Sequence, residues 1–140
     1  MKKFRYLPHT GDIKFQARGA SLEEAFSNAA LAFCSLMWDP GTIEEKLEPK
    51  VQVKGKDLEQ LLVSFLEEIL FLFETKGLVF KRADNLRIKK EKNLHSLDCI
   101  LKGDERKEKY EITGEIKAIT YNEMKIKSNK TVSIEVVVDV

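Results

Sequence analysis

The sequence predicts an α+β fold in which two helices pack on one face of a mostly antiparallel β-sheet. The apolar residues have helical spacing in two segments, both of which precede Gly77. After Gly77, apolar and polar residues alternate with the period of two that is typical of strands. Mixed strands and helices followed by a run of strands favour the α+β class. With 140 residues, 43% of them hydrophobic, the chain can bury one core, so we expect a single domain over residues 1–140.

The first predicted elements are two extended segments. Residues 4–7 form a short one that Pro8 ends. Residues 13–17 alternate apolar and polar side chains and therefore predict a half-buried strand, which ends at Gly19.

Each predicted helix begins at a capping residue. Residues 21–24, Ser-Leu-Glu-Glu, have the form of a capping box, and the apolar spacing that follows predicts a helix to about Trp38. After a predicted strand at 50–55, Asp57 can cap a second helix with a wide apolar stripe, and Gly77 suits its C-terminus.

The remainder of the chain predicts short strands that are joined by turns. We expect turns at residues 103–104 and 128–129. The apolar positions that define the strands are Leu78 to Phe80, Leu86 and Ile88, Leu97 to Leu101, Tyr110 to Ala118, Met124 and Ile126, and Ile134 to Val138.

Composition excludes several classes of protein. The 24 Lys and Arg residues balance 23 Asp and Glu residues, which argues against binding of nucleic acid through global charge but permits a local basic patch. The longest apolar runs fall short of the roughly 20 residues that span a bilayer, and no signal peptide is visible, so we expect a cytoplasmic protein. Cys34 and Cys99 lie far apart without a CxxC motif, and we expect two reduced thiols rather than a disulfide.

A basic stretch at residues 81–92 has two interpretations. It holds six Lys and Arg residues against Asp84 and Glu91. It could contact RNA or a phosphoprotein. A solvated strand edge that its lysines keep soluble explains it as well, and this is the favoured interpretation.

Two acidic residues lie where the local pattern does not require them. Asp12 follows His9-Thr10-Gly11 directly before a predicted strand, and Asp139 ends an apolar strand one residue before the α-carboxylate of Val140. If these strands are neighbours, three carboxylates converge, and like charges at that spacing repel unless a cation lies between them. Oxygen ligands favour Ca²⁺ or Mg²⁺ over zinc. From spacing alone, a turn or strand-cap residue at 12 and a frayed end at 139 are the favoured interpretation.

These residues belong to motifs by which the sequence resembles the archease family. The family's opening motif of His-Thr, a small residue, Asp and an aliphatic residue is matched at 9–13, and its helix start G-x-S-L-E-E-x-F at 19–26. Residues 57–62, 117–121 and 136–140 match three further motifs, so the likeness covers the whole chain in order. Departures from the family pattern are Gly11, Phe65 and Asn122, the last standing where His is usual.

The resemblance implies a fold similar to part of the Hsp33 chaperone and a metal-binding role. Archeases bind a divalent ion through carboxylates, and the matching positions are Asp12, Asp139 and the carboxylate of Val140. Ca²⁺ is the expected ion, with Mg²⁺ or Mn²⁺ as alternatives. His9 shares the motif, and we expect it to orient the loop rather than to bind the ion.

The function that the resemblance implies is non-catalytic. Archeases support guanylylation and multiple turnover of the RtcB-type tRNA-splicing RNA ligase, which would be the partner here, with only indirect or weak RNA contact. Two alternatives remain: an RNA- or protein-binding chaperone module that uses residues 81–92, and a metal-dependent hydrolase built on the same carboxylates. The sequence contains few candidates for the general base that a hydrolase needs.

Overall fold

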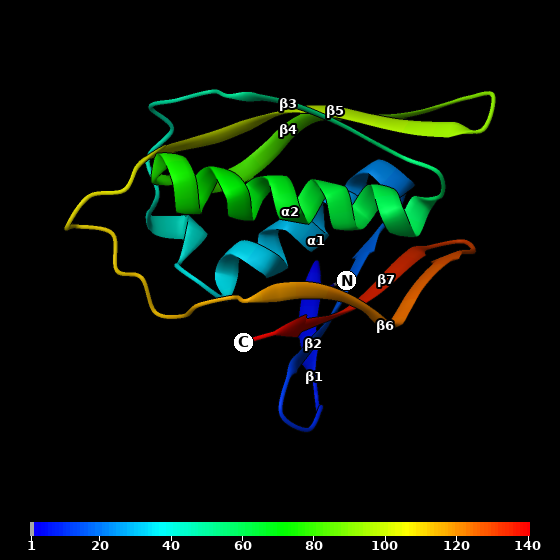
Figure 1. The fold of residues 1–140 in the computed structure, drawn as a ribbon, viewed down its shortest axis with the longest axis horizontal. Coiled ribbons are helices and arrows are strands. Elements are labelled where there is room, and N and C mark those ends of the chain that lie inside the picture. Colours follow the sequence, from blue (N-terminus) through cyan, green and yellow to red (C-terminus); the bar gives the residue numbers. More distant parts are fainter. Residues whose placement is uncertain (1) are drawn as a thin grey trace.

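The structure, a computed structural model, describes residues 2–140 and contains two antiparallel sheets with two α-helices. One sheet has the strand order β1-β2-β7-β6 and the other has the order β3-β5-β4. Helix α1 contacts both β2 and β4, and helix α2 contacts both β3 and β6. Figure 1 shows the helices between the β3-β5-β4 sheet at the top and the β1-β2-β7-β6 sheet at the bottom. In chain order the elements are β1 (Phe4–Leu7), β2 (Ile13–Gly19), α1 (Leu22–Ser35), the 3₁₀ turn η1 (Pro40–Thr42), β3 (Lys50–Gly55), α2 (Leu58–Lys76), β4 (Leu78–Glu91), β5 (Leu94–Glu105), β6 (Ala118–Ser128) and β7 (Val132–Asp139).

The prediction of an α+β fold with two helices and antiparallel strands is confirmed, but the strands form two sheets rather than one. The division has a physical reason, because each helix is apolar over a stripe too wide for a single sheet to cover. Both sheets turn their apolar faces to the helices, and the core lies between these layers. Its fully buried side chains include Phe15, Ile134 and Val136 from one sheet, Phe26 and Phe33 from α1, Leu61, Phe65 and Ile69 from α2, and Val79 and Leu97 from the other sheet.

Both predicted helix caps are formed. The Ser21 hydroxyl accepts a hydrogen bond from the Glu24 backbone N–H at 3.1 Å, and the Glu24 side chain accepts one from the Ala20 N–H at 3.0 Å. Asp57 caps α2 by accepting from the Gln60 N–H at 2.8 Å. At the other end of α2, Gly77 has φ of 62°, the left-handed conformation that ends many helices.

The structure corrects two predictions in the strand-rich half. Residues 103–104 lie inside β5 rather than in a turn, and the strand expected from 110 begins only at Ala118. In addition, β4 is one long strand with register shifts at 80–82 and 84–87, whereas the pattern suggested separate short strands. The turn at 128–129 is confirmed between β6 and β7.

Cys34 and Cys99 are both free and buried, in agreement with the prediction of reduced thiols. Burial raises the pKa of Cys99 to about 12 and that of Cys34 further, so neither thiol is ionised near neutral pH. Within residues 2–140, no helix has both the length and the hydropathy to cross a membrane.

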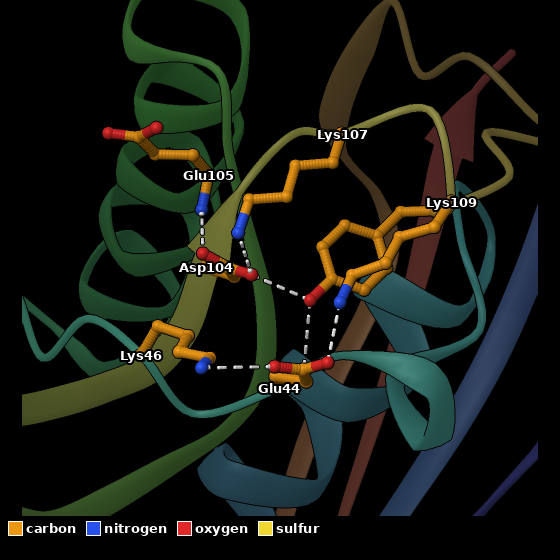
Figure 2. Close-up of polar contacts among 7 residues, drawn as sticks. Glu44, Lys46, Asp104, Glu105, Lys107 and Lys109 are labelled. Atoms are coloured by element: carbon orange, nitrogen blue, oxygen red, sulfur yellow. Dashed lines mark hydrogen bonds and ion pairs between the residues drawn. The ribbon is translucent and has the colours of Figure 1, made fainter.

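A buried polar cluster holds the irregular segment after β5. The Asp104 side chain is only 3% exposed, and it accepts hydrogen bonds from the Tyr110 hydroxyl at 2.7 Å and from Lys107 Nζ at 3.0 Å. Tyr110 in turn accepts from the Glu44 backbone N–H at 3.2 Å, and Lys109 binds the Glu44 carboxylate. Figure 2 shows these polar contacts between the segment after β5 and Glu44. The hydrogen bond from Tyr110, together with that from Lys107, lowers the pKa of Asp104 to about 2.

We therefore predict that part of the loss of stability at low pH depends on Asp104. Because its pKa is about 2 in the folded protein and about 4 in an unfolded chain, its stabilisation is complete above about pH 4 and is lost as the pH falls through 2. Urea unfolding across that range should show a steeper loss of the free energy of unfolding in the wild type than in Asp104→Asn. Parallel curves for the two proteins would contradict the prediction.

Candidate metal site

The candidate ligands lie at one end of the ladder between β2 and β7. These strands are antiparallel, and Ile13 pairs with Val138. The next residue on each strand is an aspartate, Asp12 before β2 and Asp139 at the end of β7. Facing residues in an antiparallel pair have Cα atoms roughly 4.5–5.5 Å apart. The pairing therefore brings Asp12, Asp139 and the terminal residue Val140 to the same edge of the sheet.

The main chain of Asp139 is held in the sheet rather than frayed. Its carbonyl oxygen accepts a hydrogen bond from the Lys117 N–H at 2.7 Å, and Ala118 of β6 is its partner in the ladder. The Asp139 side chain is exposed, Val140 is 40% exposed, and Asp12 is half-buried. The backbone of Asp139 is thus fixed, while its side chain and Val140 remain open to solvent.

A set of charged contacts holds the loop that carries Asp12. His9 Nε2 lies 2.8 Å from Glu123 Oε2, and Lys14 Nζ lies 3.3 Å from Glu123 Oε1 and 3.3 Å from Glu135 Oε1. The hydrogen bond from His9 and the ion pair with Lys14 lower the pKa of Glu123. The loop before β2 is therefore fastened to β6, a strand more than 100 residues later in the chain.

Glu123 is the residue of this edge that sequence reasoning missed. It has φ of 55° and lies in the part of β6 where the register with β7 shifts between Thr120 and Lys125. Such a bulge re-aims a side chain, and here it coincides with the contact between Glu123 and His9. The bulge is visible in the burial of β6: Ile119 and Met124 both pack on the core although they are five positions apart, which breaks the period of two.

The donors at this edge suit a hard cation, but they do not form a complete metal centre. Within residues 2–140, no three His, Cys, Asp or Glu side chains gather closely enough to hold a metal ion by themselves. The side chains of Asp12 and Asp139 supply carboxylate oxygens, and the sequence-based expectation adds the carboxylate of Val140. Ca²⁺ takes six to eight oxygen ligands, so water or a partner's groups would have to supply the remainder. Among residues 2–140, the Nδ1 atom of His9 is buried and has no hydrogen-bond partner.

Comparison with known proteins gives one consistent result. The family model described as "Archease protein family" matches residues 4–140. The protein archease of Methanosarcina barkeri is 41% identical over 99% of this chain and 97% of its own length. The protein archease-like of Dictyostelium discoideum is 37% identical over 100% of this chain and 95% of its own. The solution structure of Methanobacterium thermoautotrophicum protein 1598 superposes with a TM-score of 0.85 at 32% identity, and all of both chains is covered.

Proposed function

Because this chain belongs to the archease family, we propose that it is a non-catalytic, divalent-metal-binding accessory protein that activates an RtcB-type RNA ligase. In this role it promotes guanylylation of the ligase and multiple turnover in tRNA splicing. The ligase carries out the chemistry, and the accessory protein contributes a bound cation and the surface around it.

The observation that carries the proposal is the antiparallel register of β2 and β7. Pairing of Ile13 with Val138 makes Asp12 and Asp139 neighbours, with the terminal carboxylate one residue away. Three carboxylates at one edge favour occupancy by a cation, because like charges otherwise repel. Their oxygens favour Ca²⁺, with Mg²⁺ or Mn²⁺ as alternatives, over a softer metal.

The solvent exposure of Asp139 and the small number of ligands support a role that involves a partner. The carboxylates supply fewer ligands than Ca²⁺ prefers, and Asp139 is exposed. The ion would supply concentrated positive charge at a surface that a ligase can approach. The residues of this chain hold and orient it: Asp12 and Asp139 bind, while His9 positions the Asp12 loop through Glu123.

The direct test is a ligation assay with the cognate ligase at a large excess of RNA over enzyme. We expect this protein to convert the ligase from about one turnover to many turnovers. Pre-treatment with a chelator and removal of the chelator should abolish the gain, and Ca²⁺ should restore it. A turnover number that is the same with and without this protein would contradict the proposed function.

A further inference from the structure

The outer face of the β3-β5-β4 sheet carries four cations that form no ion pair with an acidic residue among those that the structure describes. Side chains of these strands alternate, so that Val51 and Leu97 point to the core while their neighbours face solvent. We define the basic face as Lys50 and Lys54 of β3 with Arg87 and Lys89 of β4. All four are exposed, and within residues 2–140 none lies within 4.0 Å of a carboxylate oxygen.

The strand register places the four cations on both sides of β5. Lys54 and Lys89 both pair with Ser96, one from each side, and Arg87 pairs with Asp98. The shift in β4 between Asp84 and Arg87 sets this arrangement. The basic stretch at residues 81–92 contributes Arg87 and Lys89 to the basic face, because side chains alternate along β4. The other two cations come from β3. Asp98, Glu91 and Asp84 are acids of the same face, and Asp84 is paired with Arg82, so a cationic surplus remains.

The basic face is hollowed rather than flat. A cavity of about 480 Å³ is lined by Lys50, Arg87 and Lys89, by the neutral amides of Gln52 and Asn85, and by the carboxylate of Asp98. A second hollow of about 820 Å³ continues along the same face beside Lys54. Three cations and one carboxylate therefore line the first depression, so a surplus of positive charge remains beside uncharged hydrogen-bonding groups.

The composition of this face favours nucleic acid over protein as its partner. Protein interfaces are enriched in aromatic residues and depleted in Lys, whereas contacts to a phosphate backbone require mainly Lys and Arg. In the described strands the outward positions carry no aromatic side chain, and Ile100 and Leu94 are the largest apolar ones. The amides of Gln52 and Asn85 can hydrogen-bond a ribose 2′-hydroxyl, which distinguishes RNA from DNA.

We propose that the basic face binds the phosphodiester backbone of RNA, weakly and without reading base sequence. Four cations can neutralise about four phosphates, and without aromatic residues there is no stacking to add affinity. The overall charge of +1 does not oppose this, because the surplus is local. The proposal does not depend on the carboxylate edge, which belongs to the other sheet.

The test measures binding of a fluorescently labelled RNA stem-loop by anisotropy between about 50 and 200 mM salt. For the wild type we expect a slope of log affinity against log salt of roughly −3 to −4. The double variant Arg87→Gln, Lys89→Gln should bind about tenfold more weakly at low salt, with a slope shallower by about two.

The matched control is Lys125→Gln, Lys127→Gln. These lysines are two positions apart, as Arg87 and Lys89 are, and they are exposed on β6 of the other sheet. Their replacement removes the same net charge. The control should bind RNA within about twofold of the wild type, since its cations are outside the basic face. Equal losses in both double variants would overturn the proposal, as would the absence of measurable binding at low salt. Equal affinity for DNA of the same sequence, or equal competition by polyglutamate, would overturn the assignment to RNA.

Discussion

Replacement of Asp139 by Asn should return the ligase to its unactivated level while the accessory protein stays folded. Asn keeps the size of the side chain but removes the negative charge that a hard cation requires. We expect Ca²⁺ affinity, measured by calorimetry, to fall at least about 100-fold. Because Asp139 is exposed, the free energy of unfolding without metal should change by less than about 0.5 kcal/mol. Asp12→Asn should behave in the same way.

A second readout separates loss of the ion from loss of the partner contact. Ca²⁺ at about 100 times its dissociation constant should stabilise the wild type by about 2.7 kcal/mol, and the Asn variants should lack that gain. Asp98→Asn is the control, because Asp98 is also an exposed aspartate of a strand but lies in the other sheet. Full multiple-turnover activation by both Asp12→Asn and Asp139→Asn would show that these carboxylates are not the site.

Replacement of Gly103 by Ala should destabilise the protein severely, by about 3 kcal/mol or more. A Cβ atom at this position would lie 2.0 Å from the Val79 carbonyl oxygen and 2.9 Å from the Phe80 Cα. Both are backbone atoms of β4, so no side-chain rotation can relieve the contact. The Gly103 carbonyl also accepts hydrogen bonds from the N–H groups of Lys46 and Leu47 at 2.7 and 2.8 Å. Thermal or urea unfolding measures the loss.

Gly77→Ala provides the comparison. A Cβ at Gly77 would meet no atom within 4 Å, and its cost arises only from the left-handed backbone, with φ of 62°. That cost is about 1–2 kcal/mol. A loss for Gly103→Ala no larger than that for Gly77→Ala would show that β4 and β5 can separate, contrary to the packing described above.

Local features could be predicted from the sequence because the residues that form them are close neighbours in the chain. The caps at Ser21 and Asp57 each involve a partner three positions later, and Gly77 follows directly on α2. The apolar stripes of both helices also repeat over a few residues, so the number and order of the helices followed from the pattern alone.

The wrong predictions concern residues whose partners are distant in the chain. Gly103 looked like a turn residue, but it is required where β5 packs closely against the backbone of β4 and where the N–H groups of residues 46–47 bind its carbonyl. Tyr110 fitted an alternating strand, yet its hydroxyl joins the buried Asp104 to the backbone of Glu44, which holds the segment out of any sheet. An alternation pattern carries no information about such contacts.

By itself, the sequence determined the class of fold, the two capped helices and the two aspartates that stand out from their surroundings, because local spacing and residue chemistry set these. Only the tertiary structure decided that the strands form two sheets, that Ile13 pairs with Val138 so that Asp12 and Asp139 are neighbours, and that a bulge brings Glu123 to His9. The same holds for the basic face, whose cations come from two strands that meet only through β5. Strand pairing joins residues that are far apart in the chain, and its register depends on the packing of the whole core.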